Sequence, residues 1–177
     1  SVTLAGTGFG FAHCYGTTPR RKLFVDNEFG RERYYRARQE DEWAGENYEG
    51  SSVLGAMEAA RKDGLIKSYH WATTLNEIVY AVSYYGPLEI GVNWYEGMVE
   101  TDINGFVKPT GEIVGGHALC LGGINWTYRY FILYNSWGKG WGNLGSAKLH
   151  FHDAERLLRE YGEFALPKKP ILPLWIS

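Results

Sequence analysis

Two short runs in the second half of the chain carry residues that can support nucleophilic catalysis: GGHALCLGG at 115–123 and YNSWGKGWG at 134–142. A neutral imidazole such as that of His117 can take the proton of a thiol and hold a thiolate–imidazolium pair, provided that a third group fixes its tautomer. The amide oxygen of Asn135 can be that third group, and Trp137 can shield the hydrogen bond from water. Taken alone, His117 fits a core histidine better than a catalytic one, and NSWGKGWG fits a glycine-rich aromatic turn.

Two cysteines are candidates for the thiol that such a histidine would activate, Cys14 and Cys120. Cys120 lies three residues after His117 on a predicted strand, so its side chain points to the opposite face and is expected in the core. Cys14 lies near the start of the chain, in the segment GTGFGFAHCYGTTP. Because two cysteines cannot build a disulfide framework, a reducing compartment is favoured.

The elements that must position these residues change character at Pro87. Before it, segments with helix-forming composition follow serine or threonine caps and stop at Gly64 and Gly86. After it, short β-prone runs separated by glycine or asparagine turns predict antiparallel strands, and a last helix is capped by Asp153. Helices first and sheet second is an α+β pattern, with two unlike lobes able to meet at a cleft. The expected helices are 28–43, 51–64, 73–86 and 153–162, and the expected strands are 88–94, 117–124, 129–137 and 146–151.

Composition narrows the classes of partner. The chain has 177 residues, enough for one domain or two small lobes, with 45% apolar and 21% charged residues. Its net charge of −2 gives no electrostatic reason to expect nucleic acid or an anionic membrane as partner. No apolar run is long enough to span a bilayer and no secretory leader is visible, so we expect a cytoplasmic or virion-associated protein. His150 and His152 lack zinc-site spacing, and we expect neither a metal nor a cofactor.

Together and in this order, the two runs resemble the His and Asn segments of the papain-like cysteine peptidases: G-H-A, then N-S-W-G-x-G-W-G eighteen residues after the histidine. YEGSS at 48–52 resembles the segment whose backbone pairs with a substrate peptide. Gly86 and Pro87 followed by LEIGV resemble the passage from helix to strand in that family. The loop DEWAGENYEG is similar to one in the short bacterial and phage-type members.

This resemblance, which covers about residues 6–166, implies one domain over 1–177 with the papain-like two-lobed α+β fold. A helical lobe with a central helix would occupy about 1–86, an antiparallel β-barrel-like lobe about 87–166, and a C-terminal tail 167–177. The resemblance also implies catalytic roles for His117 and Asn135, and a supporting role for Trp137. The remaining residues that it implies are Glu49, Gly50 and Ser51, as the floor of a substrate cleft.

The cysteine nucleophile that this resemblance leads one to expect is replaced by glycine in this sequence. The family places its nucleophile at the N-terminus of a long helix, where the helix dipole lowers the thiol pKa. Aligned on GTGFGFAH, the pattern of the short members puts Gly6 at that position. In this register Cys14 lies eight residues further on, about 12 Å along the helix axis and roughly 80° around it, so its thiol cannot reach His117. The oxyanion-hole Gln of the family would fall ahead of Ser1.

Several functional hypotheses follow. The first is a pseudo-peptidase that keeps His117 and Asn135, lacks the nucleophile at Gly6, and uses its cleft for a peptide or protein segment. The second is a working cysteine peptidase that uses Cys14, or a form altered at position 6. The proline-broken tail KKPILPLWIS suits docking to other chains of an assembly, which would be a structural role. A nucleotide-binding loop at GTGFG is a weak alternative, because no clear strand precedes it. The 16% aromatic content leaves room for a carbohydrate-binding module.

Overall fold

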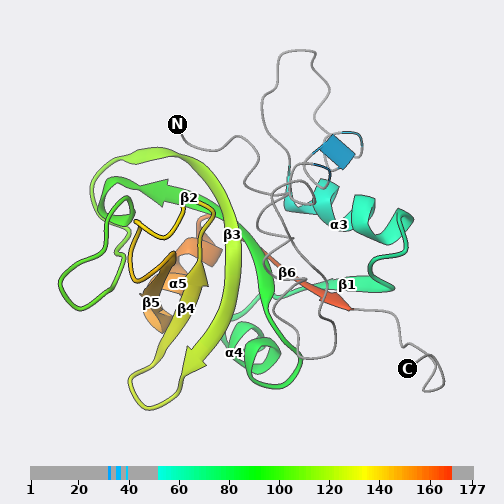
Figure 1. Ribbon diagram of the computed structural model, residues 1–177. Coiled ribbons are helices and arrows are strands. Elements are labelled where there is room, and N and C mark those ends of the chain that lie inside the picture. The colour runs from blue at the N-terminus through cyan, green and yellow to red at the C-terminus, as the bar shows by residue number, and fades with distance from the viewer. Residues whose placement is uncertain (1–31, 33–34, 37–38, 40–51, 169–177) are drawn as a thin grey trace.

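The structure is a computed structural model that describes residues 52–168, together with four helical residues further upstream, Glu32, Tyr35, Arg36 and Gln39 (Figure 1). These four fall inside the helix expected over 28–43. The predictions made for Gly6, for Cys14, for the segment 48–51 and for the tail from 169 lie outside the described residues.

An antiparallel six-stranded sheet dominates the described part of the chain, with strand order β1-β6-β2-β3-β4-β5. Strands β2 to β5 follow one another along both the chain and the sheet, as the four predicted strands did, but β3 begins four residues earlier than expected. The other two strands, β1 and β6, were not predicted. The strands are β1 (Ser68–Trp71), β2 (Leu88–Tyr95), β3 (Ile113–Asn125), β4 (Tyr130–Tyr134), β5 (Ser146–His150) and β6 (Glu163–Lys168).

Within residues 52–168, three α-helices and one short 3-10 helix accompany the sheet: α3 (Val53–Lys62), α4 (Leu75–Tyr84), η1 (Glu96–Met98) and α5 (Phe151–Arg159). The predicted caps of α3 and α4 are confirmed. The Ser52 hydroxyl accepts from the Gly55 amide at 2.9 Å, and the Thr74 hydroxyl accepts from the Glu77 amide at 3.2 Å. Gly64 follows α3 with a φ of 72°, the left-handed conformation in which helices commonly end.

The prediction that Asp153 caps the last helix was wrong. Helix α5 begins two residues earlier, at Phe151, with His150 in the cap position and no side-chain capping bond. The apolar core explains the difference, because the Phe151 ring is buried and lies 4.6 Å from that of Phe131 in β4. Burying an aromatic ring is worth more than a capping bond. Asp153 instead lies in the first turn, where a negative charge interacts favourably with the helix dipole.

The two faces of the sheet bury different cores. Helices α4 and α5 pack on one face, over inward-pointing residues of β2 such as Ile90 and Val92. Helix α3 packs on the other face, over β6 and β2 (Figure 1). Gly91 of β2 permits this close approach, since a Cβ atom there would lie 2.9 Å from Cγ2 of Val53. None of the described helices is long and apolar enough to cross a membrane.

Candidate active site

Strand pairing brings His117 and Asn135 together. His117 lies in β3, in register with Val92, and its side chain therefore shares the face of the larger core. The β3–β4 register pairs Cys120 with Tyr134, so that Asn135, the first residue after β4, lies back alongside His117. His117 Nε2 and Asn135 Oδ1 are 2.8 Å apart, and both residues are buried. His117 was expected near a strand end; it lies five residues into a longer strand.

The hydrogen bond decides which tautomer His117 adopts. Asn135 Oδ1 can only accept, and it also accepts from the Ser136 backbone amide at 2.8 Å, which fixes the side-chain amide. Nε2 of His117 must therefore carry the proton, and Nδ1 keeps its lone pair. Burial lowers the pKa of His117, and the bond to Asn135 only partly opposes this effect. The imidazole is accordingly neutral at pH 7, with Nδ1 available as a base.

Two indole rings contact the imidazole of His117, and a third packs behind them. Trp137, predicted as a shield, has its ring centroid 4.9 Å from that of His117. Trp94 of β2 lies 4.8 Å away on a T-shaped contact. Trp141 packs on both indoles, at 6.3 Å from Trp94 and 5.8 Å from Trp137, and its Nε1 donates to the Val99 carbonyl at 2.8 Å.

Sequence reasoning missed Trp94 and Trp141. The sequence held a signal for each: Trp94 continues the inward alternation of the expected strand 88–94, and Trp141 is the second tryptophan of the NSWGKGWG run. The buried Nδ2 of Asn135 and the Nε1 atoms of Trp94 and Trp137 have no hydrogen-bond partner within the described residues.

Cys120 is fully buried, as predicted, on the opposite face of β3 from His117. It lies in register with Glu89 of β2, a carboxyl group that is also fully buried. Burial, with the nearby Cys120 and Glu163, raises the pKa of Glu89 well above its ordinary value. The thiol of Cys120 therefore has no path to the His117 ring.

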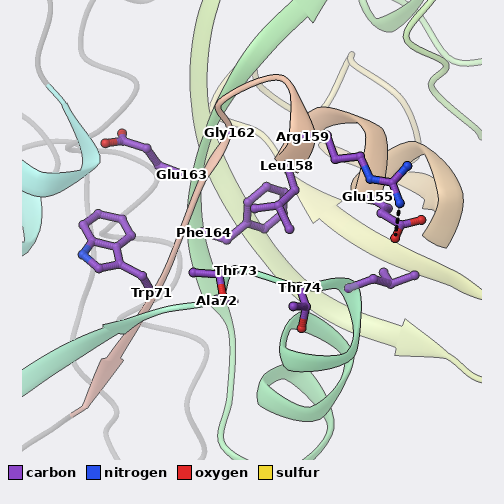
Figure 2. A pocket seen from close by; sticks show the side chains of 11 residues that line it. Trp71, Ala72, Thr73, Thr74, Glu155, Leu158, Arg159, Gly162, Glu163 and Phe164 are labelled. Carbon is purple, nitrogen blue, oxygen red and sulfur yellow. Dashed lines mark hydrogen bonds and ion pairs between the residues drawn. The ribbon is translucent and has the colours of Figure 1, made fainter.

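A cavity of about 550 Å³ lies elsewhere, between the β1–α4 connection, α5 and the start of β6 (Figure 2). Apolar side chains such as Trp71, Leu158 and Phe164 line it, and the paired Glu155 and Arg159 stand at its edge, 3.0 Å apart. None of its lining residues belongs to the His117 pair or its indoles, so the cavity is separate from the candidate active site. Among the residues that the structure places, no cluster could hold a metal ion.

Comparison with known proteins identifies the family to which His117 and Asn135 point. A family model described as "Papain family cysteine protease" matches residues 25–158, which include His117 and Asn135 and begin after Gly6 and Cys14. Curated relatives include a cathepsin B-like cysteine proteinase of Schistosoma japonicum and cathepsin B-like cysteine proteinase 3 of Caenorhabditis elegans. Each is 31% identical, over 83 and 88 residues respectively. The matches cover 45% and 46% of this chain but only 24% and 23% of the relatives' own lengths.

Solved structures share the fold at lower identity. Xylellain, a cysteine protease from Xylella fastidiosa, superposes with a TM-score of 0.72 at 14% identity, covering 94% of this chain and 80% of that one. The Carica candamarcensis cysteine protease CMS1MS2, in complex with E-64, gives a TM-score of 0.66 at 15% identity, covering 94% and 89%. The expected α+β, papain-like fold is thus confirmed. With a family match over most of its length, the chain belongs to the papain family of cysteine proteases.

Proposed function

We propose that this chain is a papain-family domain that keeps the general-base half of the site and lacks the nucleophile, and that it binds a peptide or protein segment without cleaving it. The observation that carries the base assignment is the buried 2.8 Å hydrogen bond between His117 and Asn135. It leaves Nδ1 of a neutral imidazole as the proton acceptor. The proposed loss of the nucleophile rests on the sequence register that puts Gly6 at its position.

The reaction of a cysteine peptidase shows what would be lost. The base takes the thiol proton, the thiolate attacks the peptide carbonyl, and the imidazolium then gives its proton to the leaving amine. His117, held by Asn135, has the tautomer for the first and last of these steps. Without a side chain at Gly6 the middle step has no attacking atom. The groups of such a triad act as a unit, so the loss of activity should be close to complete.

The proposed ligand would be an extended peptide, with Glu49, Gly50 and Ser51 as part of its floor. We place the helical lobe at about 1–86, the β-rich lobe at about 87–166 and a tail at 167–177. The tail is the proposed contact with other chains of an assembly, in the cytoplasm or in a virion. No nucleic acid is proposed as a partner, since the net charge is −2.

One observation favours a second candidate, an active peptidase. A binding role does not require a buried His–Asn pair with a fixed tautomer, and the pair is intact. Because Cys120 is buried on the wrong face, a working enzyme of this sequence would have to use Cys14.

A peptidyl epoxide that alkylates activated thiolates separates the two candidates by intact mass. The wild-type chain should give no adduct, and Gly6→Cys should gain a single adduct that the added substitution His117→Ala removes. Cys14→Ala is the matched control and should change nothing. An adduct on Cys14 of the folded wild-type chain, lost in His117→Ala, would establish the active peptidase instead. A folded Gly6→Cys chain that stays unmodified would show that the register at Gly6 is wrong.

A further inference from the structure

The indole of Trp94 lies against the His117 ring from the side of strand β2. The two ring centroids are 4.8 Å apart, with 65° between the ring planes. Trp137 lies against the same imidazole from the segment after β4, at 4.9 Å and 37°. The two indoles also contact each other edge to face, at 5.7 Å. The imidazole is therefore contacted by one aromatic ring from β2 and by another from the segment after β4.

Backbone pairing explains how Trp94 reaches the ring. Its partner in β3 is Gly115, and the neighbour of that residue, Gly116, also has no side chain. Gly115 shares a face of β3 with His117, two residues further along, and because Gly115 has no side chain the Trp94 indole can lie diagonally against the imidazole. Trp94 is itself only 2% exposed, which holds its indole in one place.

The indole nitrogen of Trp94 has no hydrogen-bond partner in the part of the chain that the structure describes. Its Nε1 is buried and has no acceptor among the described residues, whereas the Nε1 of Trp141 donates to the Val99 carbonyl. A purely structural tryptophan usually finds an acceptor when it is buried. Leaving a buried donor without a partner costs free energy. The contact of the ring with His117 offers a reason for a tryptophan at this position.

We propose that Trp94 is a positioning residue for His117. Its indole, together with that of Trp137, clamps the imidazole so that Nε2–H stays on Asn135 and Nδ1 remains the free base. This inference rests on the proposed role of His117 as the base of the site. It adds a positioning residue in β2, outside the two sequence runs that contain His117 and Asn135.

Two physical effects support the assignment. Stacked and edge-to-face aromatic contacts favour particular ring orientations, so the two indoles restrict rotation of the imidazole about its side-chain bonds. The two indoles also keep water from the ring, and burial is the main cause of the lowered pKa of His117. Among the described residues, the groups packed against the ring are Trp94, Trp137 and Asn135, and all three are uncharged.

The test is the tautomer and titration of His117, read by NMR on chain labelled with ¹⁵N-histidine. Trp94→Leu should shift the tautomer ratio away from Nε2–H by several-fold and move the titration midpoint up towards that of an exposed histidine. Trp94→Phe keeps an aromatic ring and should preserve both. Should Trp94→Leu fail to fold, Trp94→Met fills the space without a ring and carries the same expectation.

Trp141→Phe is the matched control. It removes a tryptophan from the same cluster, and with it the bond to Val99, but Trp141 makes no ring contact with His117 within the described residues. It should lower thermal stability and leave the His117 signals unchanged. If Trp94→Leu lowers stability and also leaves these signals unchanged, Trp94 is a packing residue and the proposal is overturned.

This readout needs neither a thiol nor a bound peptide, so it stands or fails separately from the epoxide experiment. A second readout applies if Gly6→Cys proves alkylable. In that background, Trp94→Leu should slow alkylation by about tenfold, a part of the 10²–10⁴ that a general base contributes. Trp94→Phe and Trp141→Phe should leave the rate within about twofold of the parent. An unchanged rate for Trp94→Leu would contradict the positioning role.

Discussion

Replacing Glu89 by leucine should make the protein more stable. Glu89 lies within β2, in register with Cys120 of β3 and Ala165 of β6, and faces the core beneath α3. It is fully buried, and neither carboxyl oxygen has a hydrogen-bond partner within the described residues. Burial opposes the ionisation of Glu89 most strongly, and within the described residues Cys120 and the carboxyl of Glu163 oppose it further.

The size of the effect follows from the missing hydrogen bonds. Protein mutational data place the cost of burying an unpaired polar group at about 1–3 kcal/mol, and leucine of similar size removes this cost while keeping the contacts. We therefore expect Glu89→Leu to raise the free energy of unfolding by about 2 kcal/mol near pH 5. For a chain of this length, each kcal/mol moves Tm by roughly 2–4 °C, so Tm should rise by about 4–8 °C.

The difference in free energy of unfolding between Glu89→Leu and wild type should increase as pH rises. Burial raises the pKa of Glu89 well above its ordinary value, so the folded protein holds a proton that the unfolded chain releases near pH 4.3. The stability linked to this proton is fully present below the unfolded pKa and is lost as pH rises through the folded pKa. Wild type should therefore lose stability relative to Glu89→Leu between about pH 4.3 and the folded pKa.

Urea unfolding followed by tryptophan fluorescence at pH 5 and pH 8 measures both effects. Glu89→Gln cannot ionise but keeps unpaired polar atoms, so it should abolish the pH dependence and recover less of the stability. Glu100→Gln, at an exposed position, is the control and should stay within about 0.5 kcal/mol of wild type. A Glu89→Leu protein less stable than wild type at both pH values would refute the reasoning, because it would mean that the carboxyl is satisfied.

Two further substitutions test how closely α3 packs on β2 and how α4 is capped. Gly91→Ala should lower the free energy of unfolding by about 1–2 kcal/mol, because the new Cβ would lie 2.9 Å from Val53, and the same urea experiment reports it. A neutral result would show that α3 can shift without cost. Thr74→Ala should cost about 1 kcal/mol by removing the acceptor for the Glu77 amide, and Thr74→Ser should restore most of it. Equal losses for both Thr74 variants would contradict the capping role.

The sequence predicted those features that depend on local chemistry. Ser52 and Thr74 cap their helices because capping needs only a hydroxyl a few residues from the first amides. The proximity of His117 and Asn135 followed from two strands adjacent in the chain, and the hydrogen bond confirms that they meet. Their catalytic roles, and the vacancy at Gly6, remain predictions.

Features that depend on distant partners were not predicted. Strand β1 has four residues and β6 contains Pro167, so neither has a strong strand pattern of its own. Strand β1 is ordered by pairing with β6, and β6 by pairing with both β1 and β2. Helix α5 starts at Phe151 because of the core and not because of a cap. Trp94 reaches His117 only through a strand register that composition cannot reveal.

The sheet order has a consequence for how the protein folds and opens. Strands β2 to β5 form a meander, and His117 and Asn135 are only 18 residues apart within it. Pairing of β1 with β6 joins Ser68 to Lys168, and so must close a loop of about a hundred residues. Loop-closure entropy makes such long-range pairing slow to form. The meander should fold first, and amides of the β1–β6 edge should exchange with solvent through partial openings that leave the histidine–asparagine pair protected.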